Sequence, residues 1–427
     1  MKRRNFLQLL GKAWVATPFF AGTWGCAPAV TRTDPRTGLS LGYVAGDTTS
    51  DRALIWLRAE VASRVSIHFG TDPALGRFAA TEPIPVESAS DNTACVEIDR
   101  LEPATRYYYR AAVVGKKPGP IARFVTAPAP DDDAVVRFCF SGDSRESYQP
   151  FTVMDAMRVQ QPDFFLHLGD TIYADRGGTA RRLPEFWEKY RANRRDAPSQ
   201  RLFSETAVYV VWDDHEVEDN YLPGHPLAPI GRRAFFDYWP VRRHAQEPDR
   251  IYRSFRWGRA MELFILDTRQ YRNQKVGTIL GKEQKQWLFD KLGASQARFK
   301  IIASPVPLYG GGRDRWDGYP LDRLELLQWV TRNNVRGLIC ISADLHFAAV
   351  SRVPRANGLK EITVGPIAAQ MNVLANGNAE RFEFFSNETF NYGMITIDPK
   401  ASRVQAQVEI LDQDNRLMYK TRIESGT

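Results

Sequence analysis

The sequence predicts a small antiparallel β-sandwich followed by a large α/β domain of layered β-sheets flanked by helices. Short strand patterns separated by polar turns fill residues 39–124, and longer apolar runs alternate with helical patterns after residue 134. A Pro- and Asp-rich segment, 127–133, lies between these two regions. The length of 427 residues also favours two domains, because a single core rarely supports so long a chain.

The composition is that of an ordinary globular protein. With 43% hydrophobic and 25% charged residues, 26 prolines, 30 glycines and 4 cysteines, disorder, collagen-like repeats and a disulfide-dense scaffold are excluded. The formal net charge of +7 attracts anions weakly. Phosphate compounds, nucleic acid and acidic lipid all remain open as partners on this ground, although the sequence contains no nucleic acid-binding motif.

Residues 1–29 predict a twin-arginine export signal. Two arginines at positions 3 and 4 precede a weakly apolar stretch, 6–25, which is too short and broken to span a bilayer. An amphipathic N-terminal helix is the alternative. Cys26 is a candidate lipid anchor, while 27–29 offer an ordinary cleavage site. We therefore expect the export machinery as a partner, and a location in the periplasm or at the cell surface.

Residues 35–127 predict the β-sandwich. The clearest strand patterns, at 53–58, 64–69, 95–98 and 107–112, lack helical periodicity. The segment 101–109 resembles the Leu-x-Pro-x-Thr-x-Tyr corner of fibronectin type III domains, in which a tyrosine hydroxyl holds the turn before the next strand. Because no candidate ligands cluster in this region, we expect it to support the larger domain, and we expect its removal to leave that domain's site formed.

Residues 134–425 predict the α/β domain, in which acidic residues follow the buried strands. The strand patterns are 135–140, 164–168, 208–212, 263–266, 299–303, 337–341 and 362–364, with helical patterns at 283–292 and 321–331. Ligands of open α/β sheets bind at the carboxyl ends of strands. The residues placed there are Asp143, Asp170, Asp213, Asp214, Asp267 and Asp344, with His215 and His346 close by.

These acidic residues predict a metal site. A single aspartate after a strand is usually a turn or cap residue, but four strands ending in aspartate favour a shared site. Gathered carboxylates repel one another unless a cation offsets them, and oxygen-rich sites suit Fe, Mn, Ca or Mg. Two such ions sharing one carboxylate would hold a phosphoryl group and generate hydroxide at neutral pH.

Several motifs resemble those of a known family. The Gly-Asp-x-x-Tyr element at 169–173 is similar to that of purple acid phosphatases and other calcineurin-like metallophosphoesterases. The runs Trp-Asp-Asp-His-Glu-Val at 212–217, Asp-Thr-Arg-Gln-Tyr-Arg at 267–272 and Trp-Asp-Gly-Tyr at 316–319 resemble the alkaline phosphatase D family. This resemblance implies an α/β metallophosphoesterase domain at 134–425, a fibronectin-III/Ig-like sandwich before it, and twin-arginine export.

The resemblance also implies roles for the residues that match its motifs. Asp170 would be the carboxylate that bridges two metals, and Tyr173 the phenolate on a ferric ion. His346 would complete the first metal site. Asp214 and Asp344 would hold the second metal, which can be calcium in this family.

For the remaining candidate site residues, the sequence supports weaker or alternative roles. His215 is the candidate general acid or a residue oriented by a carboxylate beside the metals, and Asn220 is a weaker candidate ligand. Where the family often has a Ser-Cys pair, this chain has Asp143, which can still ligate, and Arg145, which is then free to hold a phosphate oxygen. Arg269 either grips phosphate or pins neighbouring carboxylates.

The resemblance implies an exported phosphoesterase that attacks phosphate esters with a metal-bound hydroxide. Two or more metal ions are expected, Fe³⁺ with Ca²⁺ first and Mn²⁺ or Mg²⁺ as alternatives. One alternative is a phosphodiesterase or phospholipase acting on polymers, nucleotides or lipids. The other is a non-catalytic surface-binding protein with a degenerate site. We expect the protein to be a monomer.

Overall fold

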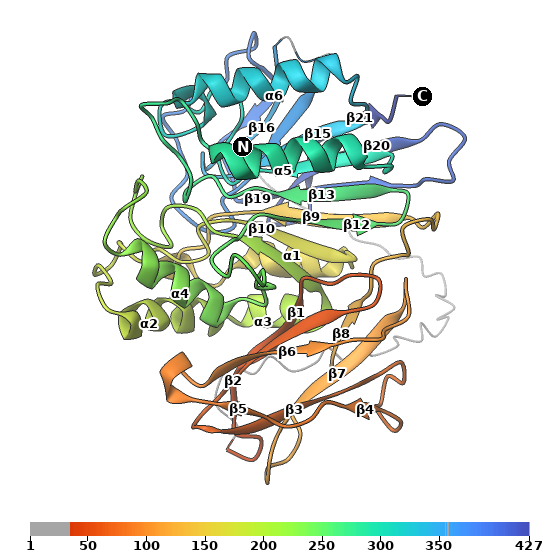
Figure 1. Ribbon diagram of the computed structural model, residues 1–427, viewed down its shortest axis with the longest axis vertical. Coiled ribbons are helices and arrows are strands. Elements are labelled where there is room, and N and C mark those ends of the chain that lie inside the picture. Colours follow the sequence, from red (N-terminus) through yellow and green to blue (C-terminus); the bar gives the residue numbers. More distant parts are fainter. Residues whose placement is uncertain (1–34, 355, 357, 427) are drawn as a thin grey trace, which may run out of the picture.

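The computed structural model describes residues 35–354, 356 and 358–426. The predicted export signal at 1–29 and the candidate anchor Cys26 therefore lie outside the described residues. Figure 1 shows helices α5 and α6 over one sheet, a second sheet beneath it, and the N-terminal strands at the far end of the molecule. Within the described ranges, no helix combines the length and apolar character that crossing a membrane requires.

The larger sheet has nine strands in the order β21-β20-β19-β9-β10-β11-β1-β2-β6. Its middle strands β9, β10 and β11 are parallel. Their apolar, mostly buried sequences are those that a sheet covered on both faces requires. The bounds are β1 Leu39–Gly46, β2 Ala53–Ala59, β6 Thr93–Ile98, β9 Val136–Ser141, β10 Phe164–Leu168, β11 Ala207–Val211, β19 Asn391–Ile397, β20 Gln405–Asp412 and β21 Leu417–Glu424.

The second sheet has seven strands in the order β12-β13-β14-β15-β17-β16-β18. Strands β13, β14 and β15 are again parallel. The two sheets face each other across one core, in which the ring of Phe164 lies 4.8 Å from that of Trp257. The bounds are β12 Arg253–Trp257, β13 Met261–Ile265, β14 Phe299–Ala303, β15 Leu338–Ser342, β16 Ala348–Arg352, β17 Lys360–Thr363 and β18 Phe382–Ser386.

Helices cover the outer faces of the two sheets (Figure 1). Leu288 of α5 and Leu326 of α6 pack with Phe264 and Ile302 of the seven-stranded sheet in a separate core cluster. The remaining helices lie on the side of the nine-stranded sheet, where α3 contacts β1. The bounds are α1 Thr152–Val159, α2 Leu183–Arg194, α3 Ala197–Glu205, α4 Ala228–Tyr238, α5 Gly281–Ala294 and α6 Pro320–Arg332, with short turns η1 Ser88–Ser90, η2 Glu146–Tyr148 and η3 Trp316–Gly318.

The N-terminal strands form an antiparallel sandwich, as predicted. One of its layers contains β3 Ser63–Gly70, β4 Ala79–Ala80, β5 Ile84–Val86, β7 Arg106–Val113 and β8 Ala122–Val125. The opposite layer is β1, β2 and β6. The predicted tyrosine corner is present, because the backbone N–H of Glu102 donates to the hydroxyl of Tyr107 over 2.9 Å.

The sandwich is less separate from the larger domain than the sequence suggested. Strand β1 pairs in parallel with β11, with Gly46 opposite Val208, so one layer of the sandwich continues the nine-stranded sheet. Trp56 donates its indole N–H to the carbonyl of Asp237 over 2.8 Å. The segment 127–133 is therefore not a free linker between independent units. Removal of the sandwich would expose an edge of the sheet that positions the site.

Candidate metal centre

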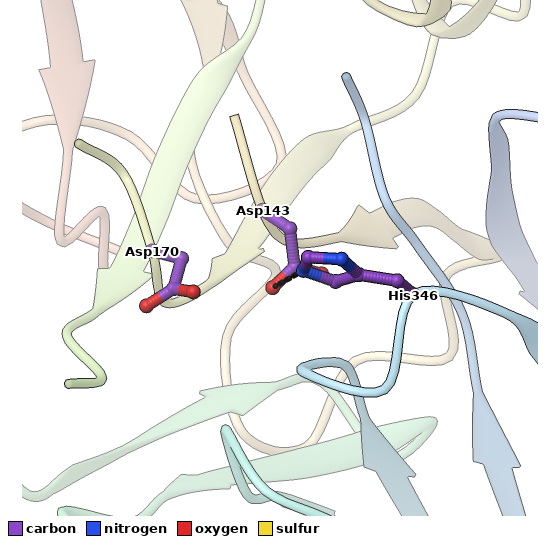
Figure 2. Close-up of side chains that lie close together, drawn as sticks. All are labelled: Asp143, Asp170 and His346. Atoms are coloured by element: carbon purple, nitrogen blue, oxygen red, sulfur yellow. Dashed lines mark ion pairs between the residues drawn. The ribbon is translucent and has the colours of Figure 1, made fainter. Parts of the chain in front are cut away.

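The carboxyl ends of the parallel strands in both sheets meet at one edge, where three groups of candidate ligands overlap. The first group is Asp143, Asp170 and His346 (Figure 2). The second is Asp170, Asp214 and His215, and in each group the ligand atoms lie within 4.8 Å of one another. Asp170 belongs to both groups, as expected of a carboxylate that bridges two ions.

The third group continues the same row from Asp214. It consists of Asp213, Asp214 and Asp344, again with ligand atoms within 4.8 Å. Asp213 and Asp214 follow β11 of one sheet, and Asp344 follows β15 of the other. The row of acidic residues therefore crosses from one sheet to the other.

The loops that carry these residues adopt unusual backbone conformations. Asp143, Asp170, Asp344 and His346 have φ values of 65°, 52°, 68° and 57°, in the left-handed region that non-glycine residues rarely adopt. Gly169 has φ 102°, and a Cβ there would lie 2.7 Å from the Cβ of Asp213. Such strain persists where the surrounding structure fixes it, and it aims these side chains at the shared edge.

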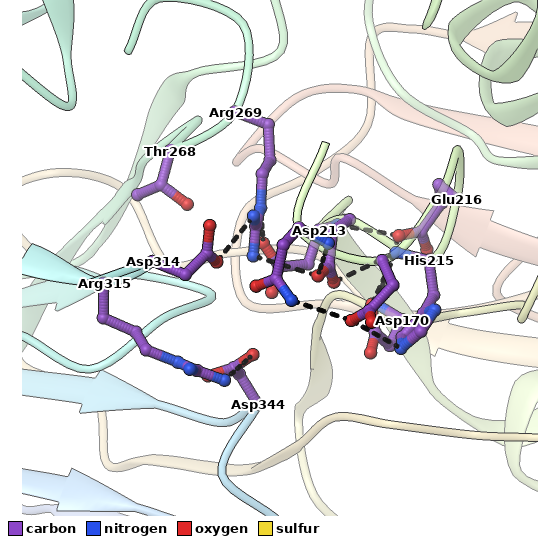
Figure 3. Close-up of polar contacts among 12 residues, drawn as sticks. Asp170, Asp213, His215, Glu216, Thr268, Arg269, Asp314, Arg315 and Asp344 are labelled. Atoms are coloured by element: carbon purple, nitrogen blue, oxygen red, sulfur yellow. Dashed lines mark hydrogen bonds and ion pairs between the residues drawn. The ribbon is translucent and has the colours of Figure 1, made fainter. Parts of the chain in front are cut away.

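Glu216 is the residue that joins two of these loops. Its buried carboxylate accepts hydrogen bonds from the backbone N–H groups of Asp170 at 3.2 Å and Asp213 at 2.7 Å. It also accepts from the N–H of Thr171 at 2.6 Å. The conformation of the loop after β10 is thereby tied to that of the loop after β11 (Figure 3).

Asp143 and Asp170 have no arginine or lysine ion pair among the described residues. Burial raises the pKa of Asp170 well above its ordinary value, and the carboxylates of Asp214, Asp213 and Asp143 raise it further. Burial also raises the pKa of Asp143, whose Oδ2 has no hydrogen-bond partner among the described residues. A buried carboxylate oxygen without a hydrogen-bond partner, beside other carboxylates, is a suitable ligand for a cation. The residues present are therefore compatible with the expected metals.

Tyr173 and His346 lie beside the first group. The Tyr173 hydroxyl is 3.2 Å from His346 Nε2, which in turn lies 3.6 Å from Asp143 Oδ1. The other ring nitrogen of His346 is 2.5 Å from the carbonyl oxygen of Gln370, so that ring's orientation is fixed. Burial, together with the nearby aspartates, raises the pKa of Tyr173 well above its ordinary value.

His215 is oriented by a carboxylate that the sequence analysis did not name. Its Nδ1 lies 2.7 Å from Asp175 Oδ1, and its ring stacks on Tyr173 with a centroid distance of 4.2 Å. Burial lowers the pKa of His215, but the hydrogen bond to Asp175 and the charge of Asp214 outweigh burial and raise it to about 9. Because Asp175 holds Nδ1, Nε2 is the nitrogen left for a proton transfer.

The third group is neutralised by arginines. Arg269 is completely buried, with Nε 2.5 Å from Asp213 Oδ1 and Nη1 2.8 Å from Asp314 Oδ2. Arg315 pairs with both oxygens of Asp344, at 2.5 and 3.0 Å. Figure 3 shows the two guanidinium groups approaching the same acidic row. The Arg269 charge holds the pKa of Asp214 below its ordinary value, although burial acts against it.

These contacts decide between the two roles considered for Arg269. A guanidinium with 0% exposure that is engaged by carboxylates is not presented to a substrate, so the phosphate-gripping role is corrected to the carboxylate-pinning one. Arg145 differs, because it is half-buried, its guanidinium lies 5.9 Å from the Tyr173 ring centroid, and its Nε has no partner among the described residues.

Asn220 contributes through its backbone. Its N–H donates to Asp214 Oδ2 at 2.7 Å, while its exposed side-chain amide donates to Asp219. The Asn220 side chain therefore does not join the ligand groups, and its backbone N–H helps to position Asp214. The predicted residues that the structure does bring together are Asp143, Asp170, Tyr173, Asp214, His215, Asp344 and His346.

Four neighbours of the site were missed by the sequence analysis. A sequence signal existed for Asp175 and Glu216, because both lie inside or just after the motifs at 169–173 and 213–216. Asp314 and Arg315 precede the Trp-Asp-Gly-Tyr run at 316–319 in a loop after β14. Only the packing of that loop against Arg269 and Asp344 reveals their part.

Two facing sheets whose strand ends carry a row of carboxylates and histidines define the class of α/β metallophosphoesterases. Within that class, the chain belongs to the PhoD-like phosphatase family, whose model matches residues 137–408. The model of the PhoD-like phosphatase N-terminal domain matches residues 25–128. The membership predicted from the motifs is thereby confirmed.

Individual relatives agree with this assignment. Alkaline phosphatase D of Bacillus subtilis is 27% identical in an alignment 393 residues long, which covers 74% of this chain and 65% of that relative's length. The solved structure of PhoD matches with a TM-score of 0.78 at 22% identity, covering 93% of this chain and 95% of the other. Purple acid phosphatase PPD1 from yellow lupin (Lupinus luteus) seeds matches with a TM-score of 0.70 at 14% identity, covering 91% and 74%. These likenesses confirm the predicted fold class.

Proposed function

We propose that the protein is an exported, metal-dependent phosphoesterase. The observation that carries this proposal is the row of overlapping ligand groups in which Asp170 is shared by two. The family and the relative named alkaline phosphatase D support the same chemistry. A degenerate, non-catalytic site is disfavoured, because each ligand type that two neighbouring cations need is present at this edge.

The chain's own residues bind the cations and the ester. Asp143, Asp170 and His346 would hold one cation, and Asp170 with Asp214 would hold the second. Asp344, expected from the sequence as a further ligand of the second cation, is paired with Arg315. When bound, such cations neutralise phosphate charge and lower the pKa of water, so that a nucleophile is available at neutral pH. The half-buried Arg145, which has no ion pair among the described residues, is proposed to bind a phosphate oxygen.

His215 is proposed to protonate the leaving oxygen. Asp175 fixes its ring through Nδ1, and the hydrogen bond to that carboxylate raises the pKa of the imidazole, which favours a bound proton. This is the protonation state that a general acid requires before the reaction.

The first metal is proposed to be Fe³⁺ and the second Ca²⁺, with Mn²⁺ or Mg²⁺ as alternatives. Tyr173 lies beside the first group, 3.2 Å from His346. A ferric ion on this phenolate would colour the purified protein, and Tyr173→Phe would bleach it while the fold is retained. A colourless, iron-free protein of full activity would refute the ferric assignment and favour divalent ions alone.

The ester class is tested by comparing turnover of a nitrophenyl phosphate monoester with that of a bis-nitrophenyl diester, in parallel with metal analysis of the protein from an exporting host. We expect hydrolysis of at least one, and the ratio separates a phosphomonoesterase from a phosphodiesterase. If neither ester, nor a phospholipid, is hydrolysed by metal-loaded protein, the non-catalytic alternative replaces the proposal.

We also propose export through the twin-arginine route, with Cys26 as a candidate lipid anchor and cleavage at 27–29 as the alternative, and a monomeric state. The pattern of residues 1–29 supports the export. Replacing the two arginines at positions 3 and 4 by lysines should hold the protein in the cytoplasm, as cell fractionation would show.

A further inference from the structure

A second cavity lies away from the acidic row. It has a volume of about 480 Å³ and is lined by the loop after β1, by Pro128 and Pro130, and by residues of the segment 242–256. None of its lining residues belongs to the three ligand groups. The N-terminal sandwich, the segment that follows it and the phosphatase domain thus each form part of its wall. Its size falls within the range of small-molecule sites.

The wall of this cavity is strongly cationic. No aspartate or glutamate is among the residues that line it. Thr49, Ser50 and Ser254 add hydroxyl groups, which hydrogen-bond to anions as readily as to neutral ligands. The basic residues are Arg242, Arg243, His244, Arg250, Arg253 and Arg256.

Carboxylates behind the wall satisfy only some of these arginines. Arg253 is fully committed, since Asp47 and two backbone carbonyls accept its hydrogen bonds. Arg242 pairs with Glu97 through Nη1. Arg250 is engaged as well, by Glu247 at 3.2 Å and by the carbonyl of Tyr252 at 3.1 Å, so Arg243 and Arg256 remain.

Arg243 and Arg256 have weak carboxylate partners. Arg243 lies 4.0 Å from an oxygen of Asp249, donates to the carbonyl of Pro248 at 3.0 Å and stacks on the ring of Phe236 at 3.6 Å. Arg256 reaches Glu262 only at 3.7 Å. Burial lowers the pKa of both arginines, as expected when a charged group is desolvated without a close counter-charge.

Two guanidinium nitrogens in the wall are buried without a hydrogen-bond partner among the described residues, namely Nη2 of Arg242 and Nε of Arg256. A buried, unpaired donor costs roughly 1–3 kcal/mol, and more when it is charged. Native proteins keep few such donors, and each calls for a partner such as an ordered water or an ion. The donors, the hydroxyl groups and the absence of carboxylates from the lining all match one kind of ligand, which is an anion.

We infer that this cavity is a second binding site, distinct from the metal centre, for an anion that carries at least two linked phosphate groups. Guanidinium groups match phosphate oxygens in geometry and charge. A single phosphate is much smaller than 480 Å³, and Arg242 and Arg256 each keep one donor without a partner among the described residues. A bound diphosphate would also hold the sandwich against the phosphatase domain.

The probe is methylenediphosphonate, whose P–C–P bridge the proposed phosphoesterase activity does not cleave. Isothermal titration of the full-length, metal-loaded protein should reveal a site that persists in Asp170→Asn, because that substitution removes only binding at the metal centre. Inorganic phosphate should bind this site at least about tenfold more weakly. Equal affinity for the two probes would contradict the requirement for two phosphate groups.

Arg243→Gln and Arg256→Gln, made singly and together, should weaken this binding by about tenfold or more, while kcat/KM for a nitrophenyl ester and the melting temperature stay near wild type. Arg403→Gln, which removes an exposed arginine elsewhere, is the matched control. If Asp170→Asn abolishes all binding of the diphosphonate, or if the arginine variants bind it as wild type does, the second site does not exist. Either result would leave the proposed hydrolytic activity intact.

Discussion

The carboxylates at the two ends of the acidic row differ in the positive charges that lie beside them. Asp213 and Asp344 at one end are paired with Arg269 and Arg315 at 2.5 Å. At the other end, Asp143 and Asp170 have no arginine or lysine ion pair among the described residues, and the pKa values of both are raised by burial. Burial also raises the pKa of Asp213, against the charge of Arg269, so the two ends differ in their arginine partners, which the Asp143 end lacks.

This difference indicates where metal affinity should reside. Removing water from a carboxylate is costly unless a positive charge replaces it. At the Asp344 end, the protein's own guanidinium groups supply that charge. At the Asp143 end, only histidines and the expected cations can supply it, so metal removal should disturb that end more.

Asp170→Asn should have the largest effect. It removes the charge shared by two ligand groups, so both metals should bind weakly and activity should collapse for every substrate. Metal content by mass spectrometry and turnover of monoester and diester measure this. Asp99→Asn, which changes an exposed carboxylate, is the control. Retention of both metals at wild-type occupancy would show that Asp170 is not the bridge.

His215→Ala should reduce activity on alkyl phosphate esters by roughly 10²–10⁴-fold, the usual range for loss of a general acid. The loss should be much smaller for nitrophenyl esters, whose leaving group needs no proton, and metal content should stay near wild type. His225→Ala, on the same loop and paired with Glu218, is the matched control. An equal loss on both esters would assign His215 to phosphate binding or orientation.

Arg269→Gln tests the arginine-paired end. It leaves the buried Asp213 and the partly buried Asp314 with one partner fewer, and breaking a buried ion pair typically costs about 3–5 kcal/mol. Denaturant unfolding should show that loss in protein with and without chelator. Arg416→Gln, which changes an arginine with 78% side-chain exposure, should change little. Unchanged stability but lost substrate affinity would restore the phosphate-gripping role.

Glu361 is a buried carboxylate outside the three ligand groups, and it has no arginine or lysine ion pair among the described residues. It accepts hydrogen bonds from Leu308, Tyr309 and Ser342, yet burial raises its pKa to about 7. The folded protein then holds this proton more tightly than the unfolded chain does. The resulting stability is fully present below about pH 4.5 and is lost as the pH rises through about 7.

Glu361→Gln should therefore remove up to about 3 kcal/mol of this pH dependence, since one pKa unit corresponds to about 1.4 kcal/mol. Denaturant unfolding at several pH values between 5 and 8 measures it. Glu388→Gln, at an exposed position, is the control. A pH profile identical to wild type would mean that Glu361 titrates normally.

The local sequence was sufficient to predict the elements and most ligand candidates. The strands were recognisable because their apolar runs are buried on both faces, as in Phe164–Leu168. Asp143, Asp170, Asp214 and Asp344 were recognisable because each directly follows such a strand. Both signals are local, and the rule that parallel strands present their carboxyl ends at one edge makes them informative.

Only the tertiary structure decided how these residues are neutralised and how the two parts of the chain join. Arg269 meets Asp213 across 55 intervening residues, and Arg315 meets Asp344 across two different loops. No local pattern distinguishes these arginines from ones that would face a substrate. Strand β1 likewise pairs with β11 through a contact far apart in sequence. The sequence determined which residues carry the chemistry, whereas long-range packing determined which charges meet, because electrostatic partners are set by distance in space and not along the chain.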